Sequence, residues 1–301
     1  MKLNNNDLKL LDLLSQDSRL KIKEAAVKLK TKNATAAYHI AKISDVVVRI
    51  PVINFYKVGS VQYHLFIKLK DFENETKNDI EKFAKQFPVV KKITHLTGNF
   101  DMLLSLTVYS NSEMAEFYDK LVELFAGKII FREMTIPYKK WYIAGNMFRT
   151  LNPRIWNISP ETKIDLNEQE RLIINELAQL KRIKELGEKT KLDEKTVRKY
   201  MKKLEKTGVI LGYSIESDLS RYGYEKYIVR FNVSDKEEII KNLGKKTGVL
   251  SIAMPVSKWD VEAKIIAQSH NDLSKLIKDI KKQVPSLSKY DVLYIEKETI
   301  N

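Results

Sequence analysis

The hydrophobic residues of positions 8–44 recur at intervals of three and four, which is the spacing of one face of an α-helix. The pattern occurs three times with polar breaks between, so it predicts three short helices. Beyond Val46 it changes to short runs of β-branched and aromatic residues, which favour strands. The helical positions are Leu10, Leu11 and Leu14, then Ala25, Ala26 and Leu29, then Ala36, Ile40 and Ile43.

The same change of pattern occurs a second time near the middle of the chain. Residues 209–215 again predict a strand or short hairpin after a helical stretch. Three short helices followed by a small β element are typical of a winged helix-turn-helix, so the sequence predicts two such domains. The helical positions of the second are Ile173, Ile174 and Leu177, then Ile183 and Leu186, then Val197, Met201 and Leu204.

Each of these segments is followed by a region whose pattern predicts the order βαββαβ, that of a ferredoxin-like domain. The fold class is therefore α+β, with two winged helix-turn-helix domains alternating with two ferredoxin-like domains. Because helices cover only one face of such a sheet, we expect the sheets to pair, within one chain or in a homodimer or larger assembly. The expected elements cover residues 61–69, 77–87, 89–97, 101–109, 111–125 and 128–136, and then 224–233, 236–245, 249–256, 260–268, 272–284 and 287–297.

Short sequence matches connect the two halves in the same order. The tripeptide Ile-Lys-Glu of residues 22–24 recurs at 183–185, and the Leu-Asn pair of residues 3–4 recurs at 166–167. The Phe-Asp pair of residues 100–101 corresponds to Trp-Asp at 259–260. The period is about 160 residues, far above that of solenoid repeats. This predicts a tandem duplication of a two-domain unit.

These patterns divide the chain into five parts. The segment between the two units contains Gly145, Pro153 and Pro160 with little periodicity, so it is expected to be a linker. The parts are a first winged helix-turn-helix at 1–56, a first effector domain at 57–143, the linker at 144–163, a second winged helix-turn-helix at 164–216 and a second effector domain at 217–301.

The composition limits the class of protein. The chain has 53 Lys and Arg against 39 Asp and Glu, a formal net charge of +14, which favours an anionic partner but also fits a solvated lysine-rich surface. The chain has no cysteine, which excludes disulfides, thiolate metal sites and cysteine nucleophiles. No apolar run is long enough for a membrane helix, and the start of the chain shows no secretory signal. We expect a cytoplasmic protein without a membrane partner.

Residues 192–204 carry the clearest functional signal. Asp193 is a good helix N-cap, and Val197, Met201 and Leu204 form an inward apolar stripe. The opposite face carries five cations over about three turns, which suits a recognition helix in the major groove of double-stranded DNA. An ordinary solvated amphipathic helix is the alternative. The proposed DNA-binding residues here are Lys195, Thr196, Arg198, Lys199, Lys202 and Lys206.

The corresponding helix of the first unit has less positive charge. Its inward residues are expected to be Ala36, Ile40 and Ile43. The outward residues have good hydrogen-bonding capacity, so this helix either reads bases or has lost DNA and serves packing. The candidate DNA-binding residues are Asn33, Thr35, Tyr38, His39 and Lys42.

Two stretches resemble the Lrp/AsnC family of transcriptional regulators. In the second unit, Asp193, Thr196 and Val197 followed by residues 204–210 (LEKTGVI) are similar to the family's recognition helix and the Gly-Val-Ile start of its wing. In the first unit, residues 97–101 (TGNFD) are similar to the family's Thr-Gly-x-aromatic-Asp turn. The resemblance spans nearly the whole chain, twice.

The resemblance implies a sequence-specific DNA-binding regulator, modulated by an amino acid or another small effector at the effector-domain interface. It places effector binding at Gly98, Asn99 and Asp101. Gly98 would form a positive-φ turn, and Asp101 would accept from a ligand ammonium or cap the neighbouring backbone. A tight turn without a ligand explains the same residues.

Both units depart from the family pattern. The first unit has VVVRIP at residues 46–51 in place of the Gly-Val-Ile start of the wing. In the second unit, the turn at residues 256–260 (VSKWD) keeps the aromatic-Asp pair but loses the glycine. The two copies therefore look specialised, one for DNA and the other for the effector.

The same architecture is similar to that of siroheme decarboxylases, which gives an enzymatic alternative. The four histidines do not share a metal-ligand spacing, and only His95 lies near the predicted turn. Neither a glycine-rich phosphate loop nor a Gly-x-Ser-x-Gly elbow occurs. We therefore expect no enzymatic activity, no cofactor and no metal site. A further alternative is an effector-sensing partner that does not bind DNA.

Overall fold

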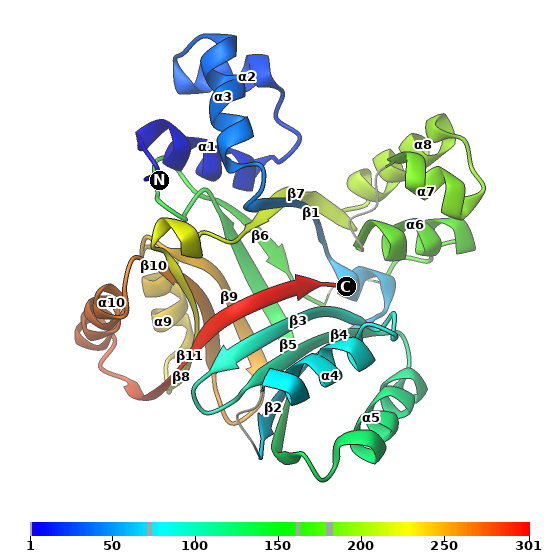
Figure 1. The fold of residues 1–301 in the computed structure, drawn as a ribbon, viewed down its shortest axis with the longest axis vertical. Coiled ribbons are helices and arrows are strands. Elements are labelled where there is room, and N and C mark those ends of the chain that lie inside the picture. Colours follow the sequence, from blue (N-terminus) through cyan, green and yellow to red (C-terminus); the bar gives the residue numbers. More distant parts are fainter. Residues whose placement is uncertain (1, 71–73, 161–162, 179–182) are drawn as a thin grey trace.

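The structure is a computed structural model that describes residues 2–70, 74–160, 163–178 and 183–301. Two three-helix heads stand apart at one end of the molecule, and a large sheet with helices packed around it forms the rest (Figure 1). Helix and strand content and order confirm the α+β class with winged helix-turn-helix and ferredoxin-type domains. Among the described helices, none has both the length and the apolar character needed to cross a membrane.

The two heads are built in the same way. The first consists of α1 (Asn5–Gln16), α2 (Ile22–Leu29) and α3 (Asn33–Ile43), and the second of α6 (Glu168–Ala178), α7 (Ile183–Thr190) and α8 (Glu194–Lys206). A capping box starts the first helix of each head: Asn4 and Asp7 bond reciprocally, as do Asn167 and Glu170. The predicted apolar stripes form the core of each head.

The wing strands of the two heads pair with each other. Strand β1 (Val47–Ile53) lies antiparallel to β7 (Ile210–Ser217), with Val47 opposite Ser217. The sequence had predicted only a local strand or hairpin after each head. Since backbone hydrogen bonds join the wings, the two heads are tied to one small sheet that lies between them (Figure 1).

The rest of each half has the predicted βαββαβ order, and short 3₁₀ turns at Phe55–Val58 and Ser220–Tyr222 precede it. In the first half the elements are β2 (Val61–Leu69), α4 (Asn74–Ala84), β3 (Val90–Thr97), β4 (Met102–Val108), α5 (Asn111–Phe125) and β5 (Ile129–Ala144). In the second half they are β8 (Glu225–Val233), α9 (Lys236–Leu243), β9 (Val249–Val256), β10 (Val261–Ala267), α10 (His270–Gln283) and β11 (Leu287–Ile300).

The last strand of each half extends across the sheet of the other half. The first part of β5 pairs with β2 and its second part with β9, while β11 pairs first with β8 and then with β3. The strand order is therefore β2-β4-β3-β11-β8-β10-β9-β5, and the β5–β2 pairing closes it into a barrel. The sheet face that helices leave uncovered in each half therefore packs against the corresponding face of the other half, within one chain.

The barrel separates three apolar regions. Helices α4 and α5 pack outside one half, and α9 and α10 outside the other. Inside, the inward residues of the two halves meet, with Phe66, Leu103, Ile228 and Leu293 among them. This interior cluster fills one end of the barrel, while the other end carries polar and charged side chains and faces the paired wings.

The segment expected to be a linker contains regular structure. Strand β5 runs to Ala144, and β6 (Arg154–Ile158) adds to its edge. Trp156 is buried against Gly212 of β7, where an added Cβ would lie 2.6 Å from the indole ring. Residues 161 and 162 of this segment lie outside the described residues. Pairing with β5 accounts for the order of a stretch that has little periodicity of its own.

Candidate DNA-binding helix and barrel pocket

Helix α8 begins where the sequence predicts. Asp193 accepts hydrogen bonds from the Thr196 backbone N–H at 2.9 Å and from its hydroxyl at 2.8 Å. These bonds hold the pKa of Asp193 below its ordinary value. Val197 and Leu204 are buried, as expected for the inward stripe, and Met201 is half-buried. The hydroxyl of Thr196 is thus already engaged in the cap.

The outer face of α8 is exposed and basic. Arg198 forms an exposed pair with Glu194 at 3.3 Å, which is too weak and solvated to withhold the guanidinium from another anion. A further cation, Lys203, reaches the buried Glu170 of α6 at 2.6 Å and so holds α8 onto its own head. The five predicted cations are all solvent-exposed: Lys195, Arg198, Lys199, Lys202 and Lys206.

Helix α3 presents a different face. Asn33 and Tyr38 are exposed and Thr35 is half-buried. The expectation that His39 faces outward is wrong: its side chain is buried, and its Nδ1 lies 2.7 Å from Asp7 Oδ1. Lys42 also bonds to Asp7 and is half-buried. The first head thus uses both side chains internally.

The capping box of α1 explains why His39 and Lys42 bond inside the head. Asp7 has no exposed surface, and a buried carboxylate needs partners. Although burial opposes its ionisation, hydrogen bonds from Lys42, the Asn4 backbone and His39 hold the pKa of Asp7 below its ordinary value.

The predicted effector turn is engaged within the protein. Gly98 has a φ of 137°, which only glycine adopts readily. Asp101 is buried and accepts from the Leu69 backbone N–H at 2.8 Å and from Lys68 Nζ at 3.0 Å. Asn99 donates to Asp291 at 2.6 Å. Of the two roles expected for Asp101, the structure shows the backbone cap.

The second half repeats this cap. Asp260 accepts from the Val233 backbone N–H at 3.0 Å. The aromatic residues of the two turns, Phe100 and Trp259, lie on the buried guanidinium of Arg230, 4.9 and 5.0 Å from its carbon. Both turns therefore serve the packing of the barrel end, and effector binding there stays a prediction.

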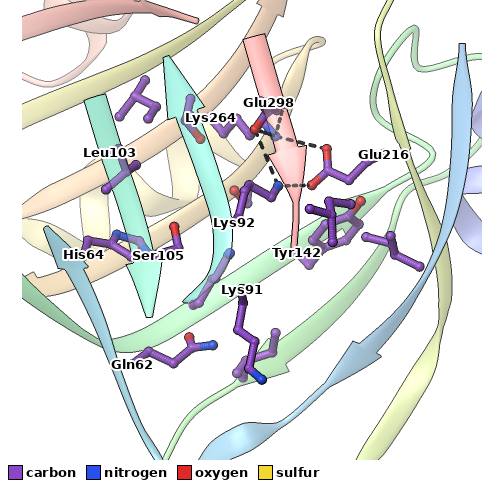
Figure 2. A pocket seen from close by; sticks show the side chains of 18 of the residues that line it. Gln62, His64, Lys91, Lys92, Leu103, Ser105, Tyr142, Glu216, Lys264 and Glu298 are labelled. Atoms are coloured by element: carbon purple, nitrogen blue, oxygen red, sulfur yellow. Dashed lines mark hydrogen bonds and ion pairs between the residues drawn. The ribbon is translucent and has the colours of Figure 1, made fainter. Parts of the chain in front are cut away.

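A pocket of about 250 Å³ lies inside the polar end of the barrel, below β1 and β7 of the wings. Figure 2 shows His64, Leu103 and Ser105 on neighbouring strands, with Lys92, Lys264, Glu216 and Glu298 gathered together. Its residues come from both halves of the chain. The apolar part of its wall includes Val52, Leu103, Ile158, Ile228 and Ile295.

One side of the pocket is a half-buried ion cluster. Glu216 of β7 bonds to Lys92 at 2.6 Å and to Lys264 at 3.0 Å. Glu298 of β11 bonds to Lys264 at 2.8 Å and to Lys226 at 3.0 Å. Figure 2 marks the bonds among Lys92, Lys264 and the two glutamates. The cluster joins the wing of the second head to the barrel.

The charges in this cluster do not balance. Three ammonium groups share two carboxylates. Burial lowers the pKa of Lys264 to about 8, and the positive charges of Lys92 and Lys226 act in the same direction. The lysines in turn hold the pKa of Glu216 and Glu298 well below the ordinary value, against the effect of burial. Both glutamates are therefore ionised and hold the wing to the barrel.

The pocket wall also includes His64, Glu262 and Lys140. His64 Nδ1 lies 3.6 Å from Glu262 Oε2, beyond hydrogen-bond distance. Burial lowers the pKa of Lys140. The sequence had singled out His95, but that side chain bonds to Glu81 at 2.7 Å and does not line the pocket. Alternation along β2 was the available signal for His64, because it shares the inward face with Phe66.

Among the described residues, no group of three or more histidine and carboxylate side chains is placed so that it could hold a metal ion. The pocket instead offers an ammonium, an imidazole and carboxylates beside an apolar wall. Such a set binds an organic ion and moves protons.

The chain is similar in part to a DNA-binding family. Residues 166–210 match the family described as winged helix-turn-helix DNA-binding. This match covers the second head and the start of β7. No curated protein is similar to this chain in sequence.

Two solved structures match nearly the full length. Both are of the siroheme decarboxylase NirDL, one alone and one with an iron-uroporphyrin III analogue. Each has a TM-score of 0.58 and covers 98% of this chain and 92% of that chain, at 14% and 15% identity. AsnC from E. coli covers 46% of this chain and 97% of its own, with a TM-score of 0.37 and 14% identity. At these identities the full-length matches show the fold.

The expectation that the chain is not an enzyme is contradicted by these matches, because both full-length structures are of an enzyme. The expectation rested on missing phosphate-loop and nucleophile motifs. Those motifs belong to other reaction types, and a shared fold can host several functions. Their absence therefore says nothing about a pocket whose residues come singly from many strands.

Proposed function

We propose that this protein is a sequence-specific transcription regulator of the Lrp/AsnC type that binds double-stranded DNA through α8. The observation that carries the proposal is the exposed basic face of α8 opposite its buried apolar stripe. A helix held in this way can lie in the major groove with its cations on phosphates and base edges. The match of residues 166–210 to a DNA-binding family supports the same helix.

The two heads take unequal shares in this proposal. Helix α8 supplies the main electrostatic contact, and α3 adds hydrogen bonds through Asn33, Thr35 and Tyr38. The shared β1–β7 sheet fixes the spacing of the two heads. The repeated order of elements supports an origin by tandem duplication.

The test is the salt dependence of binding to duplex DNA. Replacing Arg198 and Lys202 with Ala should weaken binding and reduce the slope of log affinity against log salt by about two units, since each cation neutralises about one phosphate. The matched control replaces Lys278 and Lys282, two exposed lysines on α10, with Ala. It removes the same charge elsewhere and should leave the slope nearly unchanged. Equal slopes for both variants would reject the role of α8.

A second candidate function is decarboxylation of a siroheme-type tetrapyrrole. His64, Lys140 and Glu262 favour it, because they place proton donors and acceptors in a pocket of the fold shared with NirDL. Loss of CO₂ from a carboxylate side chain leaves a carbanion that must take up a proton, which His64 or Lys140 would donate. Incubation with siroheme, followed by visible spectra and mass spectrometry for CO₂ loss, tests this candidate. Activity should fall in His64→Ala, and no mass change with the wild-type protein would reject it.

A further inference from the structure

Lys140 differs from the lysines of the ion cluster. Lys92, Lys226 and Lys264 are all bound by Glu216 or Glu298. Lys140 lies on the inward face of β5 and lines the pocket, yet forms no hydrogen bond or ion pair with any residue that the structure describes. Lys140 is half-buried, and an ammonium partly removed from water is stabilised by an anionic partner.

Glu262 is the complementary feature on the other side of β9. Its side chain is 5% exposed, and its Oε1 has no hydrogen-bond partner within the described part of the chain. A buried carboxylate oxygen without a donor is rare in folded proteins and indicates a missing partner. His64 Nδ1, beside it, is also without a hydrogen bond.

Strand register places these two groups at one level of the barrel. Lys140 and Glu262 both pair with Ala253, from opposite sides. They are therefore two strands apart, about 10 Å between backbones, and both side chains line the pocket inside the barrel. Ala253 leaves the space between them open to the pocket.

The rest of the wall sets the size and polarity of a ligand. Leu103 of β4, Ile228 of β8 and Ile158 of β6 supply apolar parts of the wall. The single ammonium of Lys140, which has no carboxylate partner among the described residues, matches a single negative charge on the ligand.

We propose that the barrel pocket binds a small amphipathic organic acid that carries a hydrogen-bond donor. Its carboxylate pairs with Lys140 Nζ, its donor group bonds to Glu262 Oε1, and its apolar body packs on Leu103 and Ile228. The site lies apart from α8 and does not depend on DNA binding.

Calorimetric titration of the full chain with matched probes tests the site. Phenyllactate and hydroxyisocaproate carry both the carboxylate and a hydroxyl donor, and phenylpropanoate and isocaproate carry only the carboxylate. Phenethylamine and isoamylamine carry neither carboxylate nor any other anion. At least one hydroxy acid should bind, its parent acid should bind more weakly, and neither amine should bind.

Two variants assign the contacts. Lys140→Met keeps the length and apolar stem of the side chain and should weaken acid binding about tenfold or more, as expected for loss of a charge-assisted bond. Lys139→Met is the matched control, because Lys139 lies outside the pocket over Trp141. Glu262→Gln should weaken the hydroxy acid more than its parent acid, and thermal melts verify that each variant is folded.

The outcomes that overturn the proposal are distinct. They are absence of binding by all four acids at millimolar concentration, equal effects of Lys140→Met and Lys139→Met, or binding of the amines as tightly as the acids. Iron-uroporphyrin III is titrated in parallel, because its carboxylates offer the same charge on a larger body. Binding of that probe alone would also overturn the small-acid site.

Discussion

The two three-helix heads have the same order of helices and the same internal ion pair, the clamp, but different outer faces. In the first, Lys42 of α3 bonds to the buried Asp7 of α1, and in the second, Lys203 of α8 bonds to the buried Glu170 of α6. In both heads the buried carboxylate belongs to the capping box of the first helix. One lysine of the third helix of each head is therefore structural.

The two heads differ in the side chains that stay exposed on the outer face of the third helix once the clamp has formed. His39 of α3 also bonds to Asp7. The outer face of α3 is therefore left mainly with neutral polar groups. Helix α8 keeps its outer cations free of buried partners. The comparison shows that counting cations along a helix is not enough, because some of them hold the helix to its own domain.

The largest expected effect comes from removing the clamp of the first head. Asp7→Ala leaves His39 and Lys42 without their carboxylate, so the free energy of unfolding should fall by about 3–5 kcal/mol. Glu170→Ala should cost only about 1–2 kcal/mol, since Lys203 is largely exposed and can be solvated. Denaturant unfolding of both variants measures the difference. Equal losses would show that the two clamps are equivalent after all.

A somewhat smaller effect tests how the second head is tied to the barrel. Glu216→Gln should reduce the free energy of unfolding by about 3 kcal/mol, because Lys92 and Lys264 then share only Glu298. Hydrogen exchange should also become faster along β7. The control Glu237→Gln, at an exposed position of α9, should change neither. Unchanged exchange in β7 would mean that the strand pairing alone holds the wing.

The smallest effect concerns the outer face of α3. Replacing Thr35 and Tyr38 with Ala removes neutral groups only, so DNA affinity should fall by about threefold or less with no change in salt slope. Fluorescence anisotropy with a labelled duplex measures both quantities. A loss as large as that of the Arg198 and Lys202 double variant would make the heads equal partners.

Much of the fold follows from local sequence patterns. The three-helix heads were predicted from apolar spacing, and Ser110 and Ser269 cap the starts of α5 and α10 by accepting from the backbone N–H groups of Glu113 and Asp272. The pairing of β1 with β7 and the extensions of β5 and β11 were not predicted. Those pairings join residues far apart in the sequence, so no local spacing encodes them.

The functional sites, too, could be predicted only where residues close in the sequence form them. The cations of α8 were predicted because a helix displays them at regular intervals. The burial of His39 depends on Asp7, more than 30 residues away, and the pocket at Lys140, Glu262 and His64 depends on closure of the barrel. Single inward residues on separate strands carry no spacing that a motif search detects.

The most direct test of the central claim is lysine footprinting with bound duplex DNA. The protein is acetylated with and without an excess of genomic DNA fragments, and the modification of each lysine is measured by mass spectrometry. We predict protection of Lys199, Lys202 and Lys206 on α8, while Lys278 on α10 stays reactive. Unchanged reactivity of the α8 lysines under conditions where DNA is bound would contradict the claim.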